Sequence, residues 1–288
     1  MPTPTFLYVG SAKCASTWMW RVFDEHPEIF VTTSKELMFF NDYYERGTDW
    51  YLSHFENGKE YACRGELSHD YFLKSIYAER IHKDFPDVKI LCCLREPMSL
   101  LRSYYKYDRR IFKRFSKHEH ANMDFIDFAK SENVNNYVDY YSNLTPFYEL
   151  FPRNKIHVMF YEDLVNTPME FYTSMLEFLQ VSPSHVVPSA HKIINPAMTP
   201  RNALLSSLAT WVADMLRRHK LESILGILKA NILLEKLFFS SKKPPIDLAI
   251  DETSPEYMHL YREFHKYDDK LSSLIGKNLP KEWSEPAN

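Results

Sequence analysis

Glycine is scarce in this sequence, since only 6 of the 288 residues are glycine. Such a low content excludes glycine-rich repeats and long flexible linkers. Positive charge is not in excess either: 35 Lys and Arg residues stand against 38 Asp and Glu residues, for a formal net charge of −3. Nucleic-acid-binding proteins are expected to be basic, so no nucleic-acid partner is predicted, although a local basic pocket is compatible with this charge.

Cysteine and long apolar runs are also sparse. The four cysteines show no CxxC or Cys/His spacing, so we expect no zinc site, and reduced thiols as in a cytoplasmic protein. The longest apolar stretch, 224–239, contains Lys229, Glu235 and Lys236, which predicts a buried or interfacial helix and no membrane span. The N-terminus starts with a strand pattern in place of a signal peptide, and no feature indicates an oligomeric state.

The chain does contain an alternation of strand and helix patterns. A length of 288 residues with 45% hydrophobic residues is enough to bury one large core. Strands are predicted at 5–9, 61–64, 88–94 and 156–160, and helices at 16–25, about 72–83, from Pro97, 137–151 and 169–179. This alternation predicts an α/β fold with a P-loop-like central parallel sheet flanked by helices.

The pattern changes after residue 181. The segment 182–200 holds four prolines, which predicts a loop that either covers the site or simply connects two regions. Helical patterns follow at 203–218, 221–239 and 254–274. We therefore expect one domain over 1–288, with an α/β core over about 1–181 and a loop with a helical cap over about 182–288.

The turn between the first strand and the first helix is the first candidate site. It consists of Gly10, Ser11, Ala12, Lys13, Cys14, Ala15, Ser16 and Thr17. Backbone N–H groups at a helix N-terminus, the charge of Lys13 and the hydroxyls of Ser16 and Thr17 together suit an anion. The turn is related to a Walker loop but does not match G-x-x-x-x-G-K-[ST]. An ordinary strand–helix turn with a solvated lysine is the alternative.

Arg95 and Ser103 form the second candidate site. Arg95 follows the apolar strand 88–94, at the edge where open α/β sheets bind ligands, and Ser103 lies early in the next helix. Together they could hold one phosphate through the guanidinium fork and the hydroxyl. Alternatively, Arg95 pairs with Glu96 or with a helix end. A Walker B strand would end in an acidic residue that holds Mg²⁺, so no metal is expected here.

The order and spacing of these motifs resemble the sulfotransferases that use 3′-phosphoadenosine 5′-phosphosulfate (PAPS). In that family the first loop holds the 5′-phosphosulfate, and the element of the Arg95 and Ser103 type holds the 3′-phosphate. The segment 35–40 (Lys-Glu-Leu-Met-Phe-Phe) resembles the K-E-x-x-F-F of heparan sulfate sulfotransferases, whose glutamate is the proposed base. Further similar segments, partly of the bacterial carbohydrate or natural-product type, are 161–164 (Tyr-Glu-Asp-Leu), 195–197 (Asn-Pro-Ala), 200–201 (Pro-Arg) and 244–245 (Pro-Pro).

This resemblance implies an enzyme that moves a sulfuryl group from PAPS to a hydroxyl or amine of a small-molecule or carbohydrate acceptor. The other product would be adenosine 3′,5′-bisphosphate (PAP). The catalytic residues would be Lys13, Glu36 and His69. The donor would bind to the loop 10–17, to Arg95 and Ser103, and to Arg201 after the proline-rich loop.

The sequence also departs from the heparan pattern. Leu67 stands where the E-K-T-P-x-Y-F segment has its lysine, and Met38 replaces a histidine or acid. Residues 67–69 (Leu-Ser-His) instead resemble the K-T-H of cytosolic small-molecule sulfotransferases, whose histidine is the base. Glu36 and His69 are therefore both candidate bases. The longer match favours Glu36, and burial beside the following phenylalanines is expected to raise its pKa.

Two other functions stay open as alternatives. A P-loop kinase would need Mg²⁺ ligands that the sequence does not display, and a non-catalytic nucleotide-binding protein would bind PAP without turnover. The basic run over 106–117 would either steer an anionic substrate or form a solvated helix face, which is the commoner role of such a run.

Overall fold

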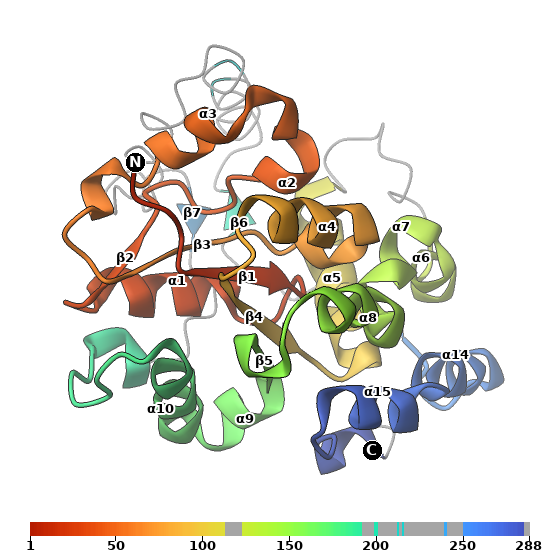
Figure 1. Cartoon of the computed structure of the whole chain (residues 1–288). Coiled ribbons are helices and arrows are strands. Elements are labelled where there is room, and N and C mark those ends of the chain that lie inside the picture. Colours follow the sequence, from red (N-terminus) through yellow and green to blue (C-terminus); the bar gives the residue numbers. More distant parts are fainter. Residues whose placement is uncertain are drawn as a thin grey trace.

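The computed structural model describes residues 1–112, 123–191, 199–200, 212, 215, 239–240 and 250–284. A five-stranded parallel sheet with the strand order β2–β3–β1–β4–β5 forms the centre of the protein (Figure 1). The strands are β1 (Phe6–Gly10), β2 (Ile29–Val31), β3 (Cys63–Leu67), β4 (Lys89–Leu94) and β5 (Ile156–Phe160). The predicted α/β fold with a central parallel sheet is confirmed.

Three strands coincide with apolar runs of the sequence. β5 has its predicted bounds, and β1 and β4 differ from prediction by no more than one residue at each end. β3 begins and ends later than predicted, because pairing with β1 and β2 draws the polar residues Arg64 and Glu66 into the sheet. The sequence does not predict β2, whose three residues form a strand through their parallel pairing with β3.

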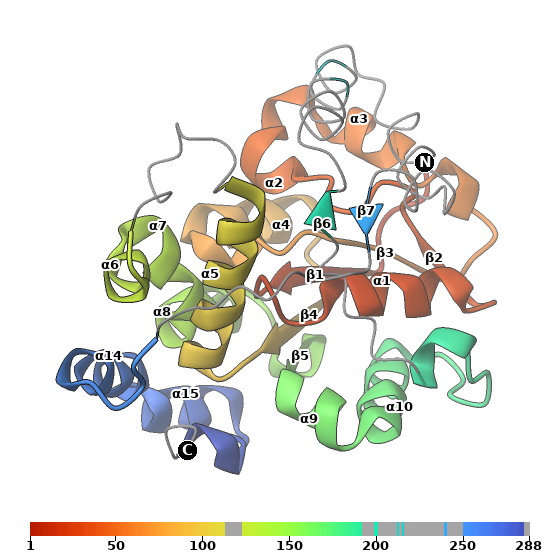
Figure 2. The same cartoon turned by 180° about the vertical axis from the view of Figure 1, so that it is seen from behind.

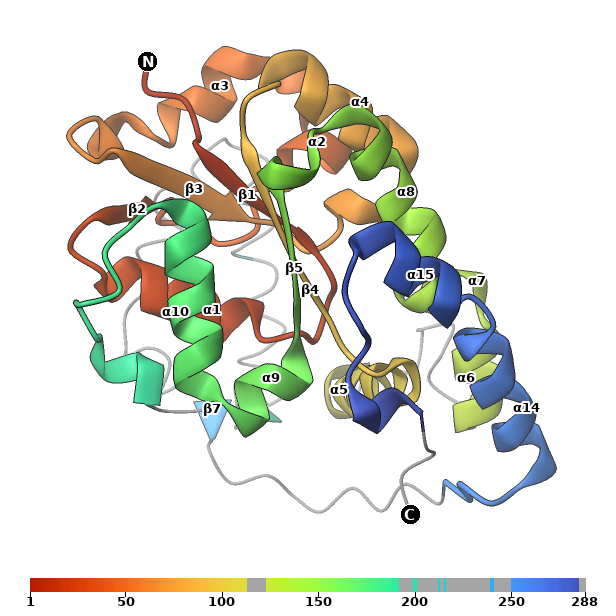
Figure 3. The ribbon, with the colours of Figure 1, turned by 60° about the horizontal axis from the view of Figure 1, so that its bottom comes forward.

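Helices lie on both faces of the sheet. α1 (Ser16–Glu25) and α10 (Pro168–Leu179) cover one face, and α4 (Ser75–Asp84) and α8 (Tyr140–Leu150) cover the other (Figure 3). α5 (Pro97–Phe112) follows β4 and packs against α6 (Phe125–Lys130). The short helices are α2 (Phe39–Asp42), α3 (Thr48–Ser53), α7 (Glu132–Asn135) and α9 (Tyr161–Asn166). Figure 2 shows the same arrangement from behind.

The end of the chain holds two helices where the sequence predicts one over 254–274. α14 (Pro255–His265) and α15 (Asp268–Ile275) are separated at Tyr267, whose φ of −110° and ψ of 12° are not helical. α14 packs against α5 and α6, and α15 packs against α8. β6 (Thr199–Pro200) and β7 (Phe239–Ser240) form a small antiparallel pair. The predicted helices 203–218 and 221–239 lie almost entirely outside the described residues, and so does Arg201.

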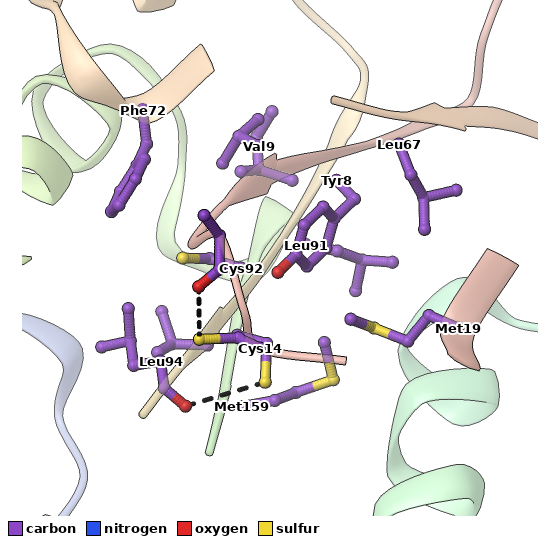
Figure 4. Close-up of a cluster of buried hydrophobic side chains, with 14 of the residues drawn as sticks. Tyr8, Val9, Cys14, Met19, Leu67, Phe72, Leu91, Cys92, Leu94 and Met159 are labelled. Atoms are coloured by element: carbon purple, nitrogen blue, oxygen red, sulfur yellow. Dashed lines mark hydrogen bonds between the residues drawn. The ribbon is translucent and has the colours of Figure 1, made fainter. Parts of the chain in front are cut away.

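β1 forms the centre of the core, since all its residues are buried. Figure 4 shows Tyr8 of this strand in one buried cluster with Cys14 and Cys92. All four cysteines are unpaired and buried. Gly10 ends the strand under the ring of Phe72: a Cβ atom at Gly10 would lie 2.4 Å from that ring, so the close approach requires glycine.

Candidate active site

Residues from all five strand ends meet at one edge of the sheet. In an open α/β protein, ligands bind outside the carboxyl ends of the parallel strands. β1 leads to Lys13, β2 to Glu36, β3 to His69, β4 to Arg95 and β5 to Tyr161. The topology therefore brings the predicted catalytic residues and Arg95 to the same edge, although up to 82 positions separate them in the sequence.

The loop 10–17 has a constrained backbone. Lys13 and Ala15 have φ angles of 62° and 64°, a left-handed conformation that residues other than glycine rarely adopt. Residues held in this way cluster at ligand-binding and active sites, where the surrounding structure maintains them. Glycine is thus not needed at position 15, where the Walker pattern would lead one to expect it.

Hydrogen bonds hold the same loop to the core. The hydroxyl of Tyr8 donates to the carbonyl of Ser11 at 2.8 Å, and Ser11 Oγ donates to the carbonyl of Tyr137 at 3.2 Å. α1 begins at Ser16, so the N–H groups of its first turn have no partner within the helix. The loop therefore offers a fixed set of donors at a helix N-terminus, which is an arrangement suited to an anion.

Lys13 lies against an aromatic ring of α5. Its Nζ atom is 4.2 Å from the centroid of the Tyr107 ring, within cation–π distance. Burial and the negative charge of Glu36 both raise the pKa of Tyr107. Tyr107 is thus near both the lysine of the first loop and the glutamate that follows β2, a position that the sequence does not reveal.

Arg95 lies at the end of β4, with its guanidinium carbon 4.3 Å from the centroid of the Tyr161 ring. Its carbonyl accepts a hydrogen bond of 2.6 Å from Tyr140, which fixes the backbone there. The Nε atom is buried and has no hydrogen-bond partner among the described residues. The carboxylate of Glu96 accepts from backbone N–H groups of α5, so the structure does not favour the alternative pairing of Arg95 with Glu96.

Ser103 and Arg201 are the other two residues that the sequence predicts to contact the nucleotide. Ser103 lies in the second turn of α5 and is half-buried, on the helix that starts just after Arg95. Arg201 follows β6 directly but lies outside the described residues. The phosphate contacts of Arg95, Ser103 and Arg201 all stay predictions.

Glu36 and His69, the two candidate bases, contact each other. Nδ1 of His69 is 3.2 Å from Oε1 of Glu36, and Nε2 is 3.3 Å from Oδ1 of Asp70. Lys35 Nζ donates to the same Glu36 oxygen at 2.5 Å. Asp70 also accepts a hydrogen bond of 2.7 Å from the Tyr137 hydroxyl. The imidazole thus bridges two carboxylates, each of which has a second partner.

The charges of this cluster set its protonation. Burial disfavours the charged form of Glu36, but the hydrogen bond from His69 and the charge of Lys35 outweigh it and lower the pKa of Glu36. Burial likewise opposes the charge of His69, yet Glu36 and Asp70 raise its pKa. The expectation that burial raises the pKa of Glu36 is therefore wrong, because it neglected the two neighbouring cations.

Several residues of this edge are not among the site residues predicted from the sequence. Asp70 and Lys35 complete the charge cluster, and Tyr107 contacts Lys13. Glu66, the buried glutamate near the end of β3, accepts hydrogen bonds from Ser68 and Tyr71, which lie just beyond the strand. A signal for Asp70 was its position next to His69 after a strand. Glu66 stands at the glutamate of the E-K-T-P-x-Y-F segment, and that match was its signal, whereas Tyr107 carries none.

A family model described as a sulfotransferase domain matches residues 3–207 of the chain. This chain belongs to the sulfotransferase family. The matched range contains every strand of the parallel sheet and all the candidate residues discussed above. The resemblance drawn from the motifs is thereby confirmed at the level of the family.

Similar proteins come from distant organisms. This chain is 29% identical over 114 residues to the membrane-associated sulfotransferase kil1 of Dictyostelium discoideum. The match covers 38% of this chain and 24% of that protein. The chain thus matches only about a quarter of that relative. The sulfotransferase of Alicyclobacillus acidocaldarius has a TM-score of 0.56 at 23% identity, covering 78% of this chain and 96% of that one. Mouse sulfotransferase SULT7A1, solved with PAP, has a TM-score of 0.50 at 15% identity, covering 95% and 88%.

Two further observations concern only the described part of this sulfotransferase. Among its helices, none combines the length and the apolar character needed to cross a membrane. In the same ranges, no three His, Cys, Asp or Glu side chains come together in a way that would hold a metal ion.

Proposed function

We propose that this sulfotransferase moves the sulfuryl group of PAPS to a hydroxyl or amine of a small-molecule or carbohydrate acceptor and releases PAP. The observation that carries the proposal is the meeting of the anion loop of Lys13 with the Glu36–His69 pair at one sheet edge. The family match and the PAP bound to the mouse neighbour support this donor.

The residues at this edge fit a donor with two separate anionic groups. The ammonium of Lys13 and the first turn of α1 suit the 5′-phosphosulfate, because both favour negative charge. Arg95 places a second cation at the end of β4, and its buried Nε, which has no hydrogen-bond partner among the described residues, suits the 3′-phosphate. Ser103 and Arg201 remain proposed further contacts of the nucleotide.

PAPS would supply an activated sulfuryl group, whose sulfur–oxygen bond to the phosphate breaks as sulfur bonds to the acceptor. Lys13 would stabilise the negative charge on the leaving phosphate oxygen. Glu36 would take the proton from the acceptor hydroxyl or amine. If the transition state is loose, as in phosphoryl transfer, little basicity is needed, so a carboxylate with a lowered pKa is adequate.

His69 is less suited to be the base. Each of its ring nitrogens faces a carboxylate, and its raised pKa favours the protonated form. An imidazolium cannot accept a proton, but it can orient Glu36 and donate to it. We therefore propose Glu36 as the base and His69 as its hydrogen-bonding partner. We also propose a cytoplasmic location, which the four buried, unpaired cysteines support.

The test uses radiolabelled PAPS and a panel of cell extracts, followed by identification of the labelled product. We expect Lys13→Ala to lower kcat by on the order of 100- to 1000-fold, as for the loss of one transition-state donor. Lys83→Ala, which removes an exposed lysine of α4, is the matched control and should keep full activity. Unchanged turnover in well-folded Lys13→Ala protein would refute the role of Lys13. PAP binding without any transfer would favour a non-catalytic nucleotide-binding protein.

A further inference from the structure

The segment 36–39, which carries Glu36, is attached to the end of β3 by successive backbone N–H groups. The N–H of Glu36 donates to the carbonyl of Leu67 at 3.0 Å. The next three N–H groups interact with side chains. The N–H of Met38 donates to Ser68 Oγ at 3.1 Å, and the N–H of Phe39 donates to the Tyr71 hydroxyl at 2.9 Å. The N–H of Leu37 interacts with the carboxylate of Glu66. We call Glu66, Ser68 and Tyr71 the anchor residues.

This attachment holds a strained backbone. Glu36 and Met38 have φ angles of 63° and 54°, in the left-handed region. Such a conformation is unfavourable for residues with a side chain, and it persists only where the surroundings enforce it. The four backbone hydrogen bonds are the contacts that enforce it here. The direction of the Glu36 side chain toward His69 therefore depends on the anchor residues.

Glu66 is at the centre of the anchor residues. It is fully buried, and its carboxylate accepts hydrogen bonds from Ser68 Oγ at 2.8 Å and from the Tyr71 hydroxyl at 2.6 Å. Each hydroxyl accepts a hydrogen bond from an N–H group of the segment and donates its own hydrogen bond to Glu66. A carboxylate that only accepts fits this set of donors, whereas an amide or a carboxylic acid would add a proton of its own.

We infer that Glu66 is a positioning residue of this sulfotransferase, which orients the Glu36 carboxylate through the backbone of 36–39 without contacting the substrate. This inference rests on the proposed role of Glu36. The net pKa of Glu66 is raised to about 7. Burial is the largest cause and the charge of Glu36 adds to it, while the hydrogen bonds from Tyr71, Ser68 and Leu37 lower the pKa in part. Glu66 also acts on the buried phenols of Tyr51 and Tyr71, whose pKa values burial and its charge raise.

The test compares Glu66→Gln with Glu25→Gln in the full chain. Glu25 is a matched control, because its carboxylate also accepts hydrogen bonds from a backbone N–H and a hydroxyl, both of Ser189. Glu25 is the last residue of α1, at the opposite end of the helix from the loop 10–17. The first measurement is the pKa of His69 by NMR titration, with the resonance assigned from His69→Gln. The wild-type value is raised by Glu36 and Asp70. We expect Glu66→Gln to bring it closer to the ordinary value of about 6.5, and Glu25→Gln to leave it unchanged.

The second measurement is turnover of PAPS, with PAP affinity by calorimetry as the control. We expect Glu66→Gln to lower kcat by on the order of 10- to 100-fold, as for a displaced catalytic group, while PAP binding at the Lys13 loop stays intact. An unshifted His69 pKa in Glu66→Gln would overturn the inference. If wild-type protein neither binds PAP nor uses PAPS, the proposed function fails, while the His69 titration still tests the positioning.

Ser68→Ala and Tyr71→Phe keep the test decisive if Glu66→Gln does not fold. Each removes one hydroxyl that joins the segment 36–39 to Glu66. Both are expected to shift the His69 pKa in the same direction as Glu66→Gln, by a smaller amount. A shift in neither variant would contradict the positioning role, because it would show that the segment keeps Glu36 in place without these links.

Discussion

Two histidines of this protein each lie between two carboxylates, one at the candidate active site and one between the C-terminal helices and α5. His69 faces Glu36 and Asp70 at 3.2 and 3.3 Å, and these side chains keep 22–30% of their surface exposed. The imidazole of His265 in α14 is only 9% exposed; it lies 2.7 Å from Asp268 and 3.3 Å from Glu96.

The two clusters differ in what else holds their acids. Glu96 accepts hydrogen bonds from the N–H groups of Met98 and Ser99, at 2.8 and 2.6 Å, so it caps the start of α5. His265 therefore ties α14 to a fixed carboxylate. The carboxylate of Glu36 is bound by the side chains of Lys35 and His69. A histidine between two carboxylates is therefore structural where it is buried and one carboxylate is bound to the backbone. The same arrangement is suited to reaction where it is half-exposed.

Glu36→Gln gives the largest expected effect. It removes the charge and the basicity of Glu36 but keeps its shape, so kcat should fall by on the order of 100- to 10,000-fold, as for loss of a general base. PAP affinity, measured by calorimetry, should stay unchanged because the nucleotide site is separate. If Glu36→Gln stays active while His69→Ala is inactive, the roles are reversed and His69 is the base.

Stability should separate the two histidines in the opposite way. His265→Ala leaves the carboxylate of Glu96, which is only 9% exposed, without its cation, so it should lower the free energy of unfolding by on the order of 3 kcal/mol. His69→Ala acts in a half-exposed cluster and should cost about 1 kcal/mol. Urea denaturation measures both, with an unchanged slope as the sign of a true stability effect. Equal losses of unfolding free energy in the two variants would contradict the structural role assigned to His265 alone.

The pH dependence of stability sharpens the same contrast. Burial opposes the charge of His265, but Asp268 and Glu96 outweigh it and raise its pKa to about 9. Its stabilising contribution is complete below the ordinary pKa of about 6.5 and is lost as the pH rises through about 9. The free energy of unfolding should therefore fall by on the order of 3 kcal/mol over this window in wild type, and by less in His265→Ala.

Glu66 loses its contribution in a lower window, which keeps the two effects apart. Its folded-state pKa of about 7 lies above the ordinary 4.5, so this contribution fades as the pH rises from about 4.5 to 7. A wild-type curve that is flat between pH 6.5 and 9 would contradict the raised pKa of His265.

Removal of divalent metal should have the smallest effect, namely none. In both clusters the two imidazole nitrogens point to different acids, so the three side chains do not converge on one point. We expect sulfuryl transfer from PAPS to keep its rate in EDTA. Loss of turnover that Mg²⁺ restores would contradict this and would support the kinase alternative.

The parts of the site that lie within one stretch of chain could be predicted from the sequence. β1, the loop 10–17 and α1 are contiguous, and an apolar strand followed by a turn and an amphipathic helix states their order directly. The same holds for β4, Arg95 and the start of α5. In each case the cation follows a strand pattern, so its place at the carboxyl edge of the sheet follows from parallel topology.

Other parts were decided only by the tertiary structure. Glu36 and His69 are 33 positions apart, and they meet because β2 and β3 are parallel neighbours. β2 has three residues and acquires its conformation from β3, so its sequence carries no clear strand pattern. The pKa values of Glu36 and His69 depend on this contact, because charge interactions act through space and weaken with distance.

His265 shows the same dependence over a longer range. The sequence places it in a helical pattern with no link to the sheet, yet it contacts Glu96, 169 positions earlier. The sequence places Glu66 at the start of a family-like segment, and its contacts with 36–39 show in the tertiary structure alone. The family, four of the five strands and the cationic loops could thus be predicted from the sequence, because these follow from local patterns. The tertiary structure decided which acids and histidines pair, because that depends on which distant segments the fold packs together.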